Sequence, residues 1–304
     1  MILPKYPIYI PSKGRSETCL TARALVHDKV PFKIVVEPQE ADAYAAKWGP
    51  HHLLVLPFSN RGSVTPARNW IADHAAASEV ERHWQLDDNL LWCYRLWQRK
   101  RRRCPFGTAL RIAEDFTDRY ENIAVSGLNY DMFVVPEMGA AIAPFYHNVH
   151  VYSCSLIRTT PAYRFRPRYN EDTDLCLQVL SDGWCTVLIN AVCVKKMWTM
   201  TMKGGNTDTL RYKNDGRLRM ARSLERDWPH VVSVDRRFRR PQHVVRDAWK
   251  KFDTPLKLKP GVDLSALTTN EYEMEFVQTK NVWGDTPAPK PMTPRTRRPS
   301  CLTR

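Results

Sequence analysis

The sequence predicts a doubly wound α/β fold, in which a mostly parallel sheet is flanked by helices. Short β-branched and aromatic runs alternate with helical patterns between residues 6 and 87. The segments between these runs are short, and such strand–helix alternation is typical of a parallel sheet. The chain of 304 residues, 43% of them hydrophobic, can bury one large core or two modest ones.

The elements of residues 6–77 follow from local apolar patterns and from the proline and glycine residues that bound them. The strands are expected over residues 6–11, 32–37 and 53–56, and the helices over 17–28, 40–48 and 65–77. Pro38 closes the second strand, and Gly49 with Pro50 ends the second helix. Thr65 and Pro66 supply an N-cap and a first-turn proline for the third helix.

The rest of the chain continues the alternation, with more basic helices near its end. Strands are expected over residues 123–128, 149–157 and 185–194, and helices over 108–120, from about 171 to 182, over 218–228 and near 249. We divide the chain into a first domain at 1–205, with halves at about 1–92 and 93–205, a basic helical region at 206–284 packed on it, and a disordered tail at 285–304. The tail is rich in proline and basic residues, which predicts disorder.

Composition restricts the class of protein. The net charge of +14 indicates a polyanionic partner, although a generically basic surface is the alternative. Eight cysteines are scattered without zinc-type spacing, as expected of reduced thiols in the cytoplasm. We find neither 18 consecutive apolar residues nor an apolar leader, so we expect a soluble, cytoplasmic protein that binds no membrane, with a monomer favoured.

The most informative stretch runs from His83 to Leu90. It predicts a short buried strand that ends in Asp87, Asp88 and Asn89. Two adjacent acids at a strand end need a cationic partner, and a divalent metal ion carrying a diphosphate would serve. The alternative is an Asp turn that caps the next helix.

Other polar residues are expected beside this motif. In doubly wound sheets, ligands bind beyond the carboxyl ends of the strands. That position brings together Ser12–Arg15, Glu37, residues 60–62 and Asp87–Asn89. Neither a G-x-G-x-x-G fingerprint nor a P-loop is present, which argues against a standard dinucleotide or P-loop site.

A second acidic centre precedes the helix that ends near residue 182. Glu171 and Asp172 lie in its first turn. There an acid can act as a general base on an incoming hydroxyl group. The alternative is structural, because acids in a first turn favour the helix dipole and Asn170 or Asp172 could cap it.

Three motifs together resemble a known family. Asn60 to Asn69 (Asn-x-Gly-x-x-x-Pro-Ala-Arg-Asn), Leu-Asp-Asp-Asn at 86–89 and Asn-Glu-Asp-Thr-Asp-Leu at 170–175 follow the order found in GT-A glycosyltransferases. The opening Ile-Tyr-Ile-Pro-Ser-Lys-Gly-Arg, Gly204-Gly205-Asn206 and Arg-Pro-Gln-His at 240–243 resemble the TET-associated glycosyltransferases of phages and eukaryotes more closely. The resemblance covers roughly residues 6 to 250.

The resemblance implies a GT-A-like, Rossmann-like fold with a nucleotide-sugar half at about 1–92 and an acceptor half at about 93–205, a UDP-sugar donor and a role for each site residue. The donor nucleotide would contact Pro11, Ser12, Lys13, Arg15, Glu37, Arg68, Asn69, Asp87 and Lys203. Asp88 and Asn89 would hold Mn²⁺ or Mg²⁺. Asp172, with Glu171 beside it, would be the base of an inverting transfer. Asn89 stands where the family's metal-binding acid is usual, which puts the metal dependence in question.

The implied acceptor is 5-hydroxymethylcytosine, or a related hypermodified pyrimidine, in DNA. If the enzyme is encoded by a phage, it would work in the host cytoplasm. Residues 203–251 carry 14 Lys and Arg against 6 Asp and Glu, a density that suits phosphate contacts. The expected DNA contacts are Arg217, Arg222, Arg236, Arg237, Arg239, Arg240 and His243. The alternatives are a glycan or protein acceptor, and a non-catalytic DNA-binding module on a degenerate GT-A fold.

Overall fold

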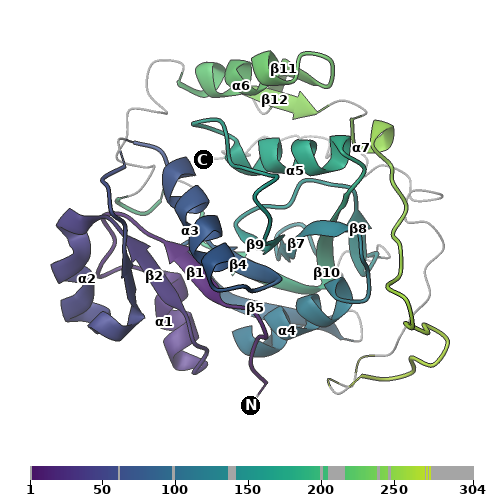
Figure 1. The fold of residues 1–304 in the computed structure, drawn as a ribbon, viewed down its shortest axis with the longest axis horizontal. Helices are drawn as coiled ribbons and strands as arrows, with labels where there is room; N and C mark the ends of the chain where they lie inside the picture. Colours follow the sequence, from purple (N-terminus) through teal and green to yellow (C-terminus); the bar gives the residue numbers. More distant parts are fainter. Residues whose placement is uncertain are drawn as a thin grey trace, which may run out of the picture.

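A ten-stranded mixed sheet forms the centre of the protein (Figure 1). The computed structural model describes residues 2–60, 62–97, 100–135, 142–198, 201–204, 216–237, 240–245, 248–270, 272 and 274. Along the sheet the strand order is β3-β2-β1-β4-β9-β7-β10-β5-β6, and β8 pairs with β10. The strands are β1 (Ile8–Pro11), β2 (Lys33–Val36), β3 (Leu53–Val55), β4 (Arg82–Leu86), β5 (Leu90–Trp97), β6 (Lys100–Cys104), β7 (Ile123–Tyr130), β8 (Phe145–His147), β9 (Cys154–Arg158) and β10 (Cys185–Lys196).

The first half of the sheet is parallel, as predicted. β2 pairs with β1 and β3, and β1 pairs with β4, all in parallel. The second half is mixed: β9 runs antiparallel to β4 and β7, and β10 runs parallel to β7 but antiparallel to β5. Only two residues separate β5 from β6, too few for a parallel crossover, so these strands form an antiparallel hairpin.

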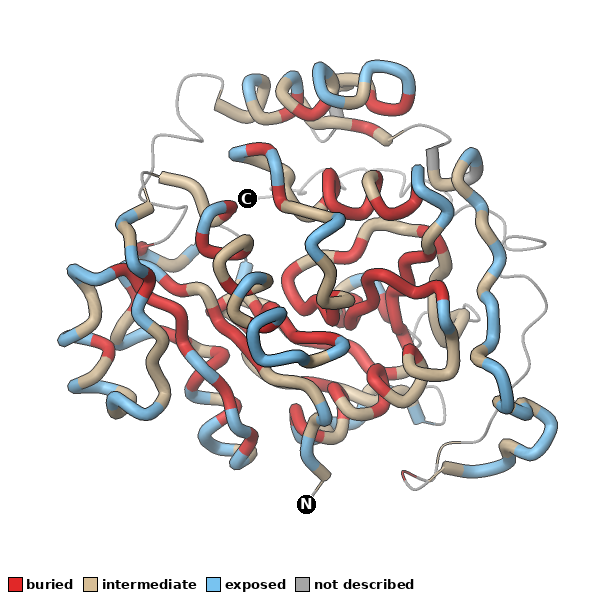
Figure 2. Tube along the Cα trace, viewed as in Figure 1, coloured by how far each residue is buried: buried red, intermediate tan, exposed pale blue. Residues whose placement is uncertain are grey.

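Helices cover both faces of the sheet. They are α1 (Leu20–His27), α2 (Ala41–Trp48), α3 (Thr65–Ala77), α4 (Phe106–Thr117) and α5 (Glu171–Ser181), and short 3₁₀ turns precede α2 and β3. Strand side chains alternate between the faces: Ile8 and Ile10 join the α1 and α4 core, whereas Tyr9 packs with Ile71 of α3. Figure 2 shows the resulting buried strands between exposed helix faces.

The start of α1 and the cap of α3 differ from the sequence prediction. Helix α1 begins at Leu20 and not at residue 17. Helix α3 begins at Thr65 with Pro66 in its first turn, as expected, but the Thr65 side chain does not cap it. The Thr65 hydroxyl instead donates to the carbonyl of Pro167 at 2.7 Å. This bond ties α3 to the segment that leads into α5.

The basic C-terminal region combines a helix with a hairpin. Helix α6 (Gly216–Asp227) agrees with the prediction, but β11 (Val232–Arg237) and β12 (Arg240–Val245) form an antiparallel hairpin, followed by α7 (Ala248–Lys251). Leu224, Val231 and Val232 are buried against Leu177 of α5, so the region lies over α5 (Figure 1). The predicted tail at 285–304 lies outside the described residues.

Two further observations bear on the sequence prediction. Among the described residues, none of the helices combines the length and apolar character needed to span a bilayer. The seven described cysteines are all free thiols.

Candidate active site

Loops that follow the parallel strands meet at one edge of the sheet, as the sequence predicted. β1 leads into Ser12–Arg15, β2 leads into Glu37, and β4 leads into Asp87–Asn89. The Lys13 ammonium lies 2.6 Å from Glu37 Oε1 and donates to the carbonyl of Asn60 at 3.0 Å. One lysine therefore joins the ends of β1 and β2 to the loop before α3.

The loop after β1 is fixed by buried polar contacts. Pro11 ends the strand, and Ser12 Oγ then donates to Asp88 Oδ2 at 2.7 Å. The Arg15 guanidinium pairs with the other oxygen of Asp88, and both side chains are about nine-tenths buried. Burial raises the pKa of Asp88, and Arg15 and Ser12 offset this only in part. The carboxylate of Asp88 is thus already occupied within the protein.

Arg15 also holds the segment that carries Lys203. Its Nε donates to the carbonyl of Lys203 at 3.0 Å and its Nη2 to that of Gly204 at 3.1 Å. Gly204 has φ +82°, and a Cβ there would lie 2.4 Å from the carbonyl oxygen of Gly14. Such a close approach requires glycine. Lys203, predicted to bind the donor, therefore lies beside the loop after β1.

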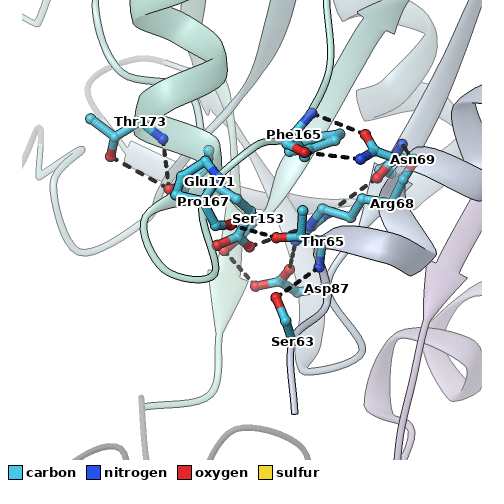
Figure 3. Close-up of polar contacts among 12 residues, drawn as sticks. Ser63, Thr65, Arg68, Asn69, Asp87, Ser153, Phe165, Pro167, Glu171 and Thr173 are labelled. Carbon is cyan, nitrogen blue, oxygen red and sulfur yellow. Dashed lines mark hydrogen bonds and ion pairs between the residues drawn. The ribbon is translucent and has the colours of Figure 1, made fainter. Parts of the chain in front are cut away.

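Asp87 is the centre of the site (Figure 3). Arg68 Nη2 donates to its Oδ1 at 2.9 Å, while Lys196 Nζ at 2.8 Å and Ser153 Oγ at 2.7 Å donate to its Oδ2. Burial disfavours the charged carboxylate, but Lys196 and Arg68 outweigh burial and lower its pKa to about 2. Asp87 is therefore ionised and held by two cations.

Arg68 connects Asp87 to the second acidic centre. Its Nε lies 3.4 Å from Oε1 of Glu171, the first residue of α5. The Arg68 side chain, which points from α3 toward both acids (Figure 3), is buried. Burial raises the pKa of Glu171, and the charge of Asp172 adds to this rise. The two acidic motifs thus belong to one site.

Asp172 faces a histidine. Its Oδ1 accepts a hydrogen bond from the amide of Thr173 at 2.7 Å, and its Oδ2 lies 3.3 Å from His150 Nε2. Burial opposes ionisation, but His150 and the Thr173 amide lower the pKa of Asp172 below its ordinary value. Asn170, the N-cap residue, makes no capping bond with its side chain and donates instead to the carbonyl of Met220 at 2.8 Å.

Two residues predicted to bind the donor are engaged within the protein. Glu37 is buried and accepts hydrogen bonds from Lys13 and Gln39. The Asn69 carboxamide donates to the Phe165 carbonyl at 2.9 Å and accepts from the Phe165 amide at 3.0 Å. Asn69 therefore positions the segment before α5, and its role toward a donor stays a prediction.

The sequence reasoning missed Lys196, Ser153, Tyr130 and His150. Lys196 ends β10, and its ammonium contacts Asp87, Ser153 and, at 3.1 Å, the Tyr130 hydroxyl. The pair Lys195-Lys196 at the end of an apolar run was the available signal. What the sequence could not supply was the strand order that brings the end of β10 to the end of β4.

The described residues do not fit the predicted divalent metal ion. They contain no group of three or more His, Cys, Asp or Glu side chains that could hold one. Asp87 and Asp88 are already paired with Lys196, Arg68 and Arg15. Asn89 Oδ1 is buried without a hydrogen-bond partner, but one neutral oxygen is a poor substitute for the carboxylates that hold such ions.

The predicted DNA contacts lie on the C-terminal region. Arg222 of α6 is exposed, as are Arg236 of β11 and Arg240 of β12, while Arg217 and His243 are partly buried. Charges on His150 and Asp172 affect the pKa of His243, which burial lowers. The hairpin packs on α5, where Val232 is buried with Leu177. Arg237 lies in β11, and Arg239 lies outside the described residues.

Comparisons with solved structures give remote similarities. A crystal structure of GalNAc-T7 with UDP, GalNAc and Mn²⁺ aligns with TM-score 0.41 and 10% identity over 65% of this chain. The alignment spans 44% of GalNAc-T7, less than half of that protein. Mannose-6-phosphate isomerase from Helicobacter pylori aligns with TM-score 0.28 and 12% identity, over 84% of this chain and 94% of the isomerase. Neither similarity is close enough to support an argument about function.

The family comparison is decisive. No curated protein sequence matches the chain. The family model of the TET-associated glycosyltransferases, in contrast, matches residues 6–205, which contain every loop and acid of the site described above. The match spans about two thirds of the chain. The chain therefore belongs to the TET-associated glycosyltransferase family and is a glycosyltransferase.

Proposed function

We propose that this protein transfers a sugar from a UDP-sugar to the hydroxyl group of 5-hydroxymethylcytosine, or of a related hypermodified pyrimidine, in DNA. The observation that carries the proposal is that the basic C-terminal region lies directly against the acids of α5. Asn170 donates to the carbonyl of Met220 in α6, and Trp228 Nε1 donates to Asp174 Oδ1 at 2.8 Å. A surface suited to a polyanion therefore borders the candidate base.

Each part of the site has a chemical task in this reaction. The loop after β1 and the segment at 201–204 would hold the nucleotide, and the cations around Asp87 would stabilise the departing diphosphate. Asp172, with Glu171 beside it, would take the proton of the acceptor hydroxyl as its oxygen attacks the anomeric carbon. Attack opposite to the leaving UDP inverts the configuration at that carbon.

Mass spectrometry of nucleosides tests the proposal. The protein is incubated with a panel of UDP-sugars and DNA that contains 5-hydroxymethylcytosine, and the DNA is then digested. We expect one hexose adduct on the modified nucleoside and none on unmodified cytosine. Transfer to a glycan or protein acceptor in place of DNA would contradict the proposed acceptor. UDP binding without turnover on any acceptor would instead favour a non-catalytic DNA-binding module.

The arginines of the C-terminal region should bind the DNA backbone without base preference. We expect the triple substitution of Arg222, Arg236 and Arg240 by glutamine to weaken DNA binding on all sequences alike. The slope of log K against log salt concentration should flatten by about one unit per lost phosphate contact. Fluorescence anisotropy at several salt concentrations measures both effects.

A matched control removes the same charge elsewhere. Arg23 of α1, Lys33 of β2 and Lys47 of α2 are exposed and lie in the nucleotide-sugar half predicted at about 1–92. Their triple replacement by glutamine changes the net charge equally, and we expect the salt slope to stay close to that of the wild type. Equal slopes for wild type and the α6–hairpin variant would place the DNA surface elsewhere.

A further inference from the structure

Ion pairs around Asp87 join three acids to three cations, and a fourth acid, Asp172, faces His150. The three acids are Asp87, Asp88 and Glu171, and the three cations are Arg15, Arg68 and Lys196. Both oxygens of Asp87 accept hydrogen bonds, from Arg68 on one side and from Lys196 and Ser153 on the other. A divalent cation at this place would add two positive charges to acids that are already neutralised.

The two cations on Asp87 are built into the fold. Arg68 is 8% exposed, and the side chain of Lys196 is 14% exposed. The Lys196 ammonium is held by Asp87, Ser153 and Tyr130. Burial disfavours its charge, but Asp87 and Tyr130 outweigh burial and raise its pKa above the ordinary value. Lys196 is therefore a permanently charged, preorganised cation, which costs no reorganisation during reaction.

Arg68 retains capacity for a further acceptor. Its Nη1 donates to Gln85 and its Nη2 to Asp87. Its Nε makes no hydrogen bond, although Glu171 Oε1 lies 3.4 Å away. A buried guanidinium N–H without a hydrogen bond is costly unless an acceptor reaches it, and diphosphate oxygens are strong acceptors for arginine.

We propose that this enzyme binds its nucleotide-sugar and stabilises the departing diphosphate without a divalent metal ion, through Lys196 and Arg68. The inference rests on the proposed sugar transfer. In that reaction the bond between the anomeric carbon and the diphosphate oxygen breaks, and its electron pair leaves with UDP. The acceptor oxygen forms the new bond, and its proton passes to the acid pair of α5. Lys196 and Arg68 compensate the charge that develops on UDP.

Calorimetric titration of UDP into the wild-type protein is the first test. It is performed once in excess EDTA and once with millimolar Mn²⁺ or Mg²⁺. We expect the two dissociation constants to agree within about twofold, a difference of less than 0.5 kcal/mol by the usual conversion. Tighter binding by about tenfold or more with the metal ion would overturn the inference. This measurement uses the wild-type protein alone.

Two substitutions in adjacent lysines form the second test. Lys196→Met should weaken UDP binding in EDTA by about tenfold or more, since a buried charge close to the diphosphate is lost. Lys195→Met should leave it unchanged, because Lys195 Nζ pairs with Asp131 Oδ2 at 3.2 Å, away from Asp87. Lys196→Arg should restore much of the affinity. Equal affinities of Lys196→Met and wild type would overturn the role of Lys196.

Electron paramagnetic resonance of Mn²⁺ gives a readout that is independent of turnover. We expect the protein with UDP to deplete the free Mn²⁺ signal no more than UDP alone does. If the protein with UDP depletes the free Mn²⁺ signal further than UDP alone, and Asp88→Asn abolishes this extra depletion, the inference is overturned. The proposed function can fail separately from this inference. UDP binding in EDTA, with no sugar transfer to any acceptor, would support the metal-free site and contradict the proposed reaction. Absence of UDP binding under both conditions would overturn both proposals.

Discussion

Asp172→Asn is expected to lower the turnover number by about 10²-fold or more, as for loss of a general base. Asparagine keeps the shape of the side chain and can still accept the hydrogen bond from the Thr173 amide. It cannot take a proton from the acceptor hydroxyl. The affinity for UDP should change little, because the contacts of Asp172 are with Thr173 and His150 and not with the loop after β1. Steady-state kinetics and UDP titration measure the two effects.

The pH profile distinguishes Asp172 from Glu171 as the base. A base works only when deprotonated, so activity is lost as the pH falls through its pKa. The pKa of Asp172 is lowered by His150 against the effect of burial, whereas burial and Asp172 raise that of Glu171. With Asp172 as base, kcat/KM should stay flat down to about pH 4, the ordinary range of aspartate. If kcat/KM instead falls with decreasing pH already above about pH 4.3, and Glu171→Gln abolishes this fall, the base is Glu171.

Asp182→Asn is the matched control, because Asp182 is an exposed acid at the other end of the same helix. We expect wild-type turnover for this variant. The structural alternative for Asp172 predicts a different pattern. Turnover would survive in Asp172→Asn, and the free energy of unfolding would fall through loss of the charge at the helix N-terminus.

The sequence predicted those features that local patterns determine. The parallel strands β1 to β4 and the helices between them follow from apolar alternation and proline or glycine punctuation, and the sheet places the ends of these strands together. Asp87 and Glu171 were found because acids at a strand end and in a first helical turn stand out locally. Arg68 of α3 connects the two acids.

Features that depend on strand order or side-chain direction were not predictable. Lys196 lies 109 residues from Asp87, and only the position of β10 in the sheet brings them together. Asp88 and Asn89 were expected to hold a metal ion, with Asp87 beside them at the donor nucleotide. Successive side chains at a strand end point to different sides, so Asp87 meets Arg68 and Lys196 while Asp88 meets Arg15.

The C-terminal hairpin was missed for a related reason. The valines of Val231-Val232-Ser233-Val234 and of Val244-Val245 were a strand signal, but the arginines between them were interpreted only as phosphate contacts. Residues 206–284 were predicted to form a basic helical region, and arginine has good helix propensity. Pairing of Val232 with Val245 and burial of Val232 against Leu177 override that preference.

Arg15→Met is expected to lower the free energy of unfolding by about 3–5 kcal/mol, the usual cost of leaving one partner of a buried ion pair unpaired. Asp88 is 6% exposed and would keep only the hydrogen bond from Ser12. The carbonyls of Lys203 and Gly204 would also lose their hydrogen bonds from Arg15. Urea denaturation measures the change. Lys47→Met is the control, because Lys47 and Glu17 form an exposed pair of the kind that contributes about 0–1 kcal/mol.

The loss of unfolding free energy caused by Arg15→Met should depend on pH. Burial already raises the pKa of Asp88 in the wild type, and removal of Arg15 must raise it further. The variant cannot accommodate the charged carboxylate of Asp88. Its loss of unfolding free energy should therefore be largest at neutral pH and become smaller as the pH falls and Asp88 takes up a proton. Adding Asp88→Asn to Arg15→Met removes that charge at every pH, and we expect the double variant to regain much of the lost stability. A double variant as unstable as Arg15→Met at neutral pH would mean that the loss arises from the released segment at Lys203 and Gly204 and not from the unpaired carboxylate.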